Sequence, residues 1–341
     1  MTVTRIEAIE VRLPFLRPLA TVEGTHTHRH SVLVGLHDED ETGWGEAPAM
    51  PSGRFGTADE AWRAVTAGVF DAPGIASAAH QAAMADLEAR HRGLPLHRFL
   101  GGSEGPVGVR VAVGISRDLD RLTENVGMLV DRGVTAIKLK VAPGADVGPL
   151  TVLGAEFPDI DVSVDANGSY RDADDPSLRE LDRLGVTLVE QPFAVDDLAS
   201  HARLRDRVEM AVCLDEGVQS IETAIEAMAT GAADVLSVKV LRHGLADFTK
   251  ILRTARDTGV GIQVGGTFDT SIGRRFLLAC ATLPGVTRAE VAPPDTYLEA
   301  DLADYPPLVD GTVRPDGIGL GTTPDPELLD AVVVRRTEIE A

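Results

Sequence analysis

Short apolar runs, each carrying a charged residue at or near its end, recur along the middle of the chain at an almost constant spacing. Five of them read TAIKLK, DVSVD, VTLVE, AVCLD and VLSVK, and they carry in turn Lys140, Asp165, Glu190, Asp215 and Lys239. The intervals between these charged residues are 25, 25, 25 and 24 positions. Turn residues and an amphipathic stretch follow each run, so the pattern predicts a repeated strand–loop–helix unit.

The same alternation extends over residues 108–293. One further strand is predicted at 109–115, before the five runs, and two more at 259–266 and 287–292, after them. Eight strands joined by short crossovers predict an α/β fold, a closed (β/α)₈ barrel. Continuous apolar runs are typical of parallel strands that are covered on both faces, as the strands of such a barrel are.

Charges at the ends of buried parallel strands are costly unless something pairs them. The carboxyl ends of barrel strands meet around one mouth, where active sites of this fold are built. We therefore expect the lysines, Lys138 included, and the three carboxylates to converge there, since surface caps would not share one period. Three carboxylates favour a hard divalent cation, Mg²⁺ or alternatively Mn²⁺, with Asp165, Glu190 and Asp215 as its ligands.

The first part of the chain follows a different pattern. Alternating stretches within residues 4–47 predict three antiparallel strands, and two stretches with helical spacing follow them near 58–69 and 75–92. Strands followed by helices predict an α+β unit. We expect this unit to span residues 1–104 and the barrel to span residues 105–304.

The motifs KLK, VDAN, VEQP, LDEG and VKV, in this order and spacing, resemble those of the enolase superfamily. A lysine-x-lysine pair opposed by a single lysine marks its muconate lactonizing enzyme subgroup. The GGTFDTSIGR stretch at 265–274 resembles the branch of o-succinylbenzoate synthases and N-succinylamino acid racemases. The dipeptide epimerases of the subgroup carry Asp-x-Asp after the eighth strand, where this chain has VAPPD.

This resemblance covers nearly the whole chain and implies the roles of its parts. The α+β unit would be a capping domain, completed by residues 305–341, whose loops near 15–24 and 51–55 close over the barrel mouth. The resemblance also implies a Mg²⁺-dependent reaction that begins with loss of a proton α to a carboxylate. The amine that takes this proton must be neutral, so its pKa must fall, which a nearby cation promotes.

A synthase is the activity that we favour, and its reaction would form o-succinylbenzoate in menaquinone biosynthesis. The resemblance implies that Lys140 then acts as base and acid, that Lys239 stabilises the intermediate as a cation, and that Lys138 supports Lys140. In a racemase Lys140 and Lys239 would both be bases, so N-succinylamino acid racemase and muconate-type cycloisomerase remain alternatives. Residues expected to support the metal or the substrate are Asn167, Glu216, Gly266 and Thr267.

Composition restricts the partners. A net charge of −21 and a pI near 4.8 argue against nucleic acid and anionic membranes. The first residues alternate like a strand instead of forming the apolar core of a signal peptide, and no apolar run approaches the ~18 residues of a membrane span. Two cysteines in apolar runs fit a reducing compartment. We expect a cytoplasmic protein that binds a small-molecule carboxylate, and the sequence leaves a homo-oligomer open.

Two further alternatives depend on particular residues. His26, His28 and His30 alternate and would share one face of a strand, where they could bind a metal or form a polar strand edge. We favour the polar edge, because no carboxylate or cysteine accompanies the histidines. The second alternative is a barrel that binds a ligand without chemistry. We expect such a barrel to lack a metal ligand or a lysine, whereas this chain has the full set.

Overall fold

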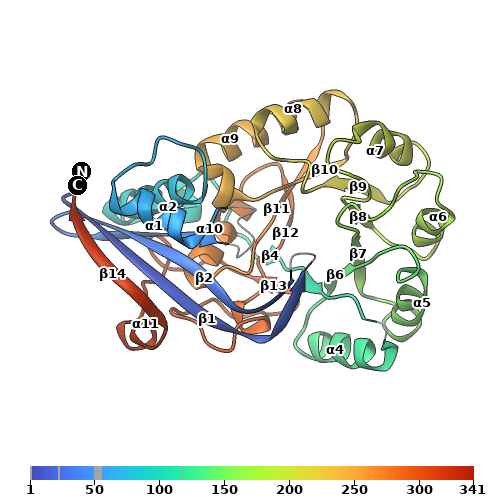
Figure 1. Cartoon of the computed structure of the whole chain (residues 1–341), viewed down its shortest axis with the longest axis horizontal. Coiled ribbons are helices and arrows are strands. Elements are labelled where there is room, and N and C mark those ends of the chain that lie inside the picture. The colour runs from blue at the N-terminus through green and yellow to red at the C-terminus, as the bar shows by residue number, and fades with distance from the viewer. Residues whose placement is uncertain (1, 22–23, 50–55, 117) are drawn as a thin grey trace.

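Two sheets organise the chain, one of four antiparallel strands and one of eight parallel strands, and they lie next to each other in Figure 1. The structure is a computed structural model and describes residues 2–21, 24–49, 56–116 and 118–341. Within these ranges, none of the helices combines the length and the apolar character that crossing a bilayer requires.

The larger sheet confirms the α/β barrel that the repeated pattern predicts. Its strands pair in chain order from β5 to β12 and curve into the wall of a barrel, with most of the intervening helices outside it (Figure 1). The strands are β5 (Val111–Val113), β6 (Ala136–Lys140), β7 (Asp161–Asp165), β8 (Leu188–Glu190), β9 (Ala211–Leu214), β10 (Val235–Val238), β11 (Gly261–Val264) and β12 (Val286–Ala289). The helices are α4 (Leu119–Asp131), α5 (Val147–Glu156), α6 (Pro176–Arg183), α7 (Leu198–Arg205), α8 (Ile221–Ala229), α9 (Val240–Thr258) and α10 (Ser271–Ala281).

The strand register explains why a constant interval brings charges together. Lys140 pairs with Asp165 across β6 and β7, and Asp165 pairs with Glu190 across β7 and β8. β9 and β10 end one residue earlier than predicted, so that Asp215 and Lys239 each follow the last residue of a strand. Lys239 is the N-cap of α9 instead of a residue within a strand, because α9 begins at once at Val240.

The smaller sheet has the order β14-β1-β2-β3 and contains the three strands predicted near the N-terminus. These are β1 (Arg5–Thr21), β2 (Gly24–His37) and β3 (Thr42–Ala49), and they are followed by α1 (Ala58–Thr66), α2 (Ile75–His91) and α3 (Leu96–Phe99). The prediction of a loop near 15–24 is wrong for most of its length, because β1 and β2 continue as a hairpin with an irregular register between Pro14 and Leu19. The other expected loop, 51–55, lies outside the described residues.

The C-terminal part of the chain returns to the smaller sheet. After the 3₁₀ turn η1 (Pro294–Thr296), the strand β13 (Thr312–Val313) pairs with β4 (Val107–Gly108). Helix α11 (Pro326–Val332) leads into β14 (Val333–Glu340), which pairs antiparallel with β1. The domain boundaries expected from the sequence, 1–104 and 105–304, stay predictions.

A buried carboxylate joins the smaller sheet to the barrel. Glu46 on β3 is completely buried and accepts hydrogen bonds from the Ser31 hydroxyl (2.6 Å), the Thr270 hydroxyl (2.7 Å) and the Gly273 amide (2.9 Å). The last two donors lie at the start of α10. Glu46, from the smaller sheet, therefore caps the N-terminus of this barrel helix. Burial, together with the nearby Asp269, raises the pKa of Glu46.

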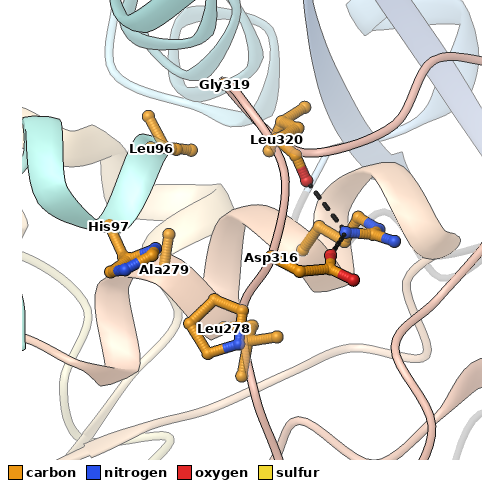
Figure 2. Close-up of a pocket in the computed structure, with 9 residues that line it drawn as sticks. Leu96, His97, Leu278, Ala279, Asp316, Gly319 and Leu320 are labelled. Atoms are coloured by element: carbon orange, nitrogen blue, oxygen red, sulfur yellow. Dashed lines mark hydrogen bonds and ion pairs between the residues drawn. The ribbon is translucent and has the colours of Figure 1, made fainter. Parts of the chain in front are cut away.

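A small cavity lies where the C-terminal segment crosses α3 and α10 (Figure 2). Its volume is about 10 Å³, which is room for a single water molecule. Arg275 donates to Asp316 Oδ1 (2.6 Å) and to the Leu320 carbonyl (3.2 Å) beside it, which fixes the crossing segment. This cavity is too small for an organic substrate.

Candidate active site

Lys138 lies inside the rim and contacts three carboxylates. Its Nζ lies 2.7 Å from Glu190 Oε1 and 3.7 Å from Asp165 Oδ2, and it also forms an ion pair with Glu290. Burial alone would lower the pKa of Lys138, but the three carboxylates outweigh burial and raise it well above its usual value. Lys138 is therefore held as an ammonium ion that bridges several strand ends.

Glu190 is completely buried and both of its oxygens are engaged. Lys138 binds Oε1, while Gln263 Nε2 donates to Oε2 at 2.7 Å. Burial and the like charges of Asp165 and Glu290 raise the pKa of Glu190 to about 7, although Lys138 acts in the opposite direction. The surroundings of Glu190 thus supply less positive charge than its ionised form requires.

Lys140 lies at the outer side of the rim and begins a short polar chain. Its Nζ donates to Asp165 Oδ2 at 2.8 Å and to Asn167 Oδ1 at 2.6 Å. Asn167 Nδ2 in turn donates to Glu216 Oε1 at 2.9 Å. The sequence therefore selected two residues, Asn167 and Glu216, that the structure joins to Lys140, while their role in supporting a metal stays a prediction.

Lys239 follows β10 and is held by two other carboxylates. Its Nζ lies 3.1 Å from Asp215 Oδ1 and 3.9 Å from Glu290 Oε2. Burial opposes the charge, but Asp215 and Glu290 outweigh it and raise the pKa of Lys239. A side chain at Gly265 would place its Cβ only 2.8 Å from the amine, so this glycine leaves the space that Lys239 occupies.

The raised pKa values of Lys138 and Lys239 differ from the lowered pKa that a basic amine needs. The physical reason is that the carboxylates at this rim face ammonium groups, which stabilises the protonated lysines. The expectation of a lowered pKa concerned an amine beside a divalent cation, and that arrangement stays a prediction.

Sequence reasoning missed Glu290, which lies just beyond β12 and contacts both Lys138 and Lys239. Its two oxygens therefore connect the lysines of β6 and β10 across the barrel. Burial raises the pKa of Glu290, but the two lysines outweigh burial and lower it. The signal was present in RAEVA, where a lone carboxylate stands within the eighth apolar run.

Gly266 and Thr267 follow β11, but the structure turns them toward other protein groups. A Cβ at Gly266 would overlap the guanidinium group of Arg274. The Thr267 hydroxyl donates to Asp269 Oδ1 at 2.6 Å. Their expected contact with a substrate stays a prediction.

The donor set of the rim is suited to a hard cation, although its side chains are not arranged around one. In the part of the chain that the structure describes, no three His, Cys, Asp or Glu side chains form a metal-binding group. Ion pairs instead connect four carboxylates (Asp165, Glu190, Asp215 and Glu290) to three ammonium groups. This excess of acidic oxygen, with the raised pKa of Glu190, fits the requirements of Mg²⁺ or Mn²⁺.

The end of β1 reaches the loops that follow β11 and β12. The Phe15 ring packs edge-on against Phe268, with ring centroids 5.8 Å apart, and Phe268 packs against Tyr297 at 5.3 Å. The Leu16 amide donates to the Tyr297 carbonyl at 2.9 Å. The smaller sheet therefore contributes Phe15 to a group of three aromatic rings on the side of the barrel where the rim lies.

The three alternating histidines share a face of β2, as strand alternation predicts. His26, His28 and His30 are all half-buried, whereas the intervening Arg29 is buried. His28 Nδ1 accepts a hydrogen bond from Arg12 at 3.3 Å. The interpretation of the three histidines as a polar strand face, rather than a metal site, stays a prediction.

The fold and rim together define a (β/α) barrel that carries buried acids and lysines at the carboxyl ends of its strands and packs against an antiparallel sheet. The family model described as "Enolase C-terminal domain-like" matches residues 121–328, which is more than half of the chain. The chain belongs to this family of the enolase superfamily, as its motifs predict.

Individual relatives extend over almost the whole chain. An o-succinylbenzoate synthase from Enterococcus faecalis is 29% identical over 95% of this chain and 96% of its own. An N-succinylamino acid racemase from Thermus thermophilus is 32% identical over 93% of this chain and 94% of its own. The crystal structure of an enolase superfamily member from Listeria innocua superposes with a TM-score of 0.90, covering 100% of this chain and 99% of its own, and its 24% identity supports the fold alone.

Proposed function

We propose that this protein is an o-succinylbenzoate synthase, which uses Mg²⁺ to remove a proton α to a carboxylate and then releases water. The observation that carries the proposal is the placement of two lysines in one rim of linked carboxylates. Lys140 is bound to Asp165, and Lys239 is bound to Asp215. The relatives named as synthases support the same activity.

The proposed metal ligands are Asp165, Glu190 and Asp215, and Mn²⁺ would suit the same oxygen donors. A bound cation would hold the carboxylate of the substrate and stabilise the negative charge that develops when the α-proton leaves. The excess of carboxylates over ammonium groups at this rim supports the assignment.

The two lysines have unequal surroundings, which favours a synthase over a reaction with two bases. The Lys140 side chain is 40% exposed and contacts a single carboxylate, so its amine can reach a substrate in the mouth. We assign to Lys140 the removal of the α-proton and its return to the leaving hydroxyl. The C–H and C–O bonds break, water leaves, and the ring becomes aromatic.

Lys239 has the opposite character and would stay charged. Its side chain is 10% exposed and lies near two carboxylates, Asp215 and Glu290. We propose that Lys239, as an ammonium ion, stabilises the anionic intermediate. Lys138, which is 5% exposed and bridges Asp165 and Glu190, would hold these carboxylates in place.

N-succinylamino acid racemase is the second candidate. The observation in its favour is the presence of two rim lysines on different strands, because a racemase must remove and return a proton on opposite faces of one carbon. A relative with this name is 32% identical to the chain. In that reaction Lys239 would have to give up its proton, which its two carboxylate neighbours oppose.

Two assays on the purified protein with Mg²⁺ decide between these activities. The first supplies the hydroxycyclohexadiene carboxylate precursor and follows o-succinylbenzoate by ultraviolet absorbance. The second supplies N-succinyl amino acids and follows optical rotation. We expect turnover in the first assay. Turnover in the second assay alone would replace the synthase by the racemase.

A barrel that only binds a ligand would give no turnover in either assay. Exchange of the α-proton for deuterium, followed by proton NMR in D₂O with Mg²⁺ and a series of carboxylic acids, extends the test to other substrates. We expect exchange with at least one acid, and its absence throughout would favour the binding role.

A further inference from the structure

Gln191 directly follows Glu190 and has an unusual backbone conformation. It is completely buried, and its φ of +39° lies in the left-handed region that residues other than glycine rarely adopt. Such a conformation is strained and persists only where the surroundings impose it. The contacts of Gln191 therefore show what this conformation achieves.

The side chain of Gln191 holds the loop that carries the next carboxylate. Its Oε1 accepts hydrogen bonds from the backbone amides of Asp215 at 3.1 Å and Gly217 at 3.0 Å. The backbone amide of Gln191 donates to the Cys213 carbonyl at 2.8 Å. Gln191 thus fixes the backbone at the end of β9, from which the Asp215 side chain extends.

The backbone of the same segment also holds the loop after β7. The Gly168 amide donates to the Gln191 carbonyl at 2.7 Å, and the Ala166 amide donates to the Glu190 carbonyl at 3.0 Å. Ala166 directly follows Asp165 in the chain. The segment of Glu190 and Gln191 therefore bonds to the backbone beside both other carboxylates.

The contacts of Nε2 fix the orientation of the Gln191 side-chain amide. Its Nε2 donates to the Phe193 carbonyl at 2.9 Å and lies 3.3 Å from His201 Nε2. His201 Nδ1 lies 2.7 Å from the Asp197 carbonyl, which can only accept, so the proton is on Nδ1 and Nε2 is an acceptor. A flipped amide would lose all four contacts.

From these contacts we infer that Gln191 is a positioning residue that sets the separation of Asp165, Glu190 and Asp215 for a divalent cation. The inference rests on the proposed function, because the cation belongs to that site. Groups that orient metal ligands change metal affinity by about 10- to 100-fold when they are removed. Gln191 acts through backbone amides instead of through the ligand oxygens.

The test compares Mn²⁺ binding, measured by electron paramagnetic resonance, in the wild-type protein and three variants. Gln191→Met keeps the length of the side chain but removes both hydrogen-bonding ends, and its Kd for Mn²⁺ should rise about 10- to 100-fold. Asp182→Ala is the matched control at the other end of β9, where Asp182 Oδ1 accepts from the amides of Glu209 (3.0 Å) and Met210 (2.7 Å). The control should lower the melting temperature without changing this Kd.

Gln191→Glu keeps the test decisive if Gln191→Met fails to fold. A glutamate retains the acceptor for the two backbone amides, and its buried carboxyl, neutral because burial disfavours the charged form, keeps an O–H donor for the Phe193 carbonyl, so its Kd for Mn²⁺ should stay within about threefold of wild type. An unchanged Kd in Gln191→Met, an equal rise in Asp182→Ala, or a loss of binding in Gln191→Glu would overturn the positioning role. A wild-type protein that binds no Mn²⁺ would instead refute the proposed function.

Discussion

Among the residues of the rim, Lys140 combines exposure with contact to a proposed metal ligand. Because it is 40% exposed and donates to Asp165 without supplying a ligand oxygen, its amine and the proposed metal would have separable roles. Lys140→Ala should lower kcat by at least about 10³-fold, within the usual range for loss of a general base. The Kd for Mg²⁺ from calorimetric titration should stay roughly the same.

A suitable control is Lys250→Ala, since Lys250 lies on the exposed side of α9 and pairs with Asp247. Neither kcat nor the Kd for Mg²⁺ should change in this variant. A Lys140→Ala protein that retains turnover, or one in which metal binding is lost together with turnover, would contradict the assigned role.

A pH dependence of stability follows from His243, which is buried and whose Nε2 has no hydrogen-bond partner among the described residues. Burial, with the adjacent Arg242, lowers its pKa from 6.5 to about 4, although Asp247 and Asp215 act in the opposite direction. Between pH 6.5 and about 4, His243 is therefore protonated in the unfolded chain but neutral in the folded chain. This contribution to stability is present above pH 6.5 and is lost as the pH falls toward 4.

His243→Gln removes this titration, so its free energy of unfolding should depend less on pH between 6.5 and 4 than that of the wild type. The shift of about 2.5 pH units corresponds to roughly 3 kcal/mol at most. Urea unfolding at a series of pH values measures the difference. Parallel curves for the two proteins would show that folding does not lower the pKa of His243.

The sequence predicted the rim residues that follow one another at a single strand–loop–helix interval and missed those outside that series. Asp165 and Glu190 were predictable because one strand–loop–helix unit separates neighbours in the register. Glu290 escaped because the interval from Lys239 to it spans two such units and the eighth strand was expected to end later. Gln191 was not predictable, since an uncharged residue in a loop reveals its role only through the amides that it contacts.

At the scale of elements, the packing of β3 against α2 depends on glycines in the strand. A Cβ added at Gly45 would overlap the carbonyl oxygen of Ala79 in α2, and backbone atoms cannot move aside as a flexible side chain can. Gly45→Ala should therefore destabilise the protein by about 1–3 kcal/mol, the usual cost of overpacking. Urea unfolding measures the change.

Gly154→Ala is the matched control, because Gly154 lies within helix α5 and a Cβ there meets no atom within 4 Å. Alanine is a better helix former than glycine, so this variant should be more stable by up to about 1 kcal/mol. Equal effects of the two substitutions would show that β3 and α2 are not held at the observed separation.

Elements buried on both faces were predictable, whereas elements defined by a partner strand were not. The runs of β6 to β10 are apolar enough to be recognised alone. β14 alternates between half-buried and exposed residues and resembles a charged tail until it pairs with β1. Similarly, the segment 15–24 contains Pro18 and suggests a loop, while β1 continues to Thr21 and its last residues, 19–21, pair with β2.

At the scale of the whole molecule, the excess of acid at the rim should couple metal binding to folding. Carboxylates that repel one another in the folded state destabilise it, and a cation that binds only the folded state stabilises it by mass action. At 100 times its Kd, Mg²⁺ should contribute about 2.7 kcal/mol. Chelation should therefore lower the melting temperature measured by differential scanning calorimetry.

The variant Asp215→Asn removes one proposed ligand and should reduce this difference, as well as turnover. Asp234→Asn is the control, because Asp234 lies near the opposite end of the barrel and pairs with Arg205. This variant should leave the effect of Mg²⁺ on the melting temperature unchanged. If chelation left the melting temperature of the active wild-type protein unchanged, the proposed three-ligand site would be contradicted.

The central claim is that acids and lysines from successive strands act together to take a proton from a substrate that a divalent cation holds. It is tested most directly by formation of o-succinylbenzoate from its precursor, before chelation, after chelation, and after Mg²⁺ is restored. We predict that turnover is lost on chelation, returns with Mg²⁺, and is absent in Lys140→Ala under all three conditions. Turnover that persists through chelation, or that survives the loss of Lys140, would contradict the claim.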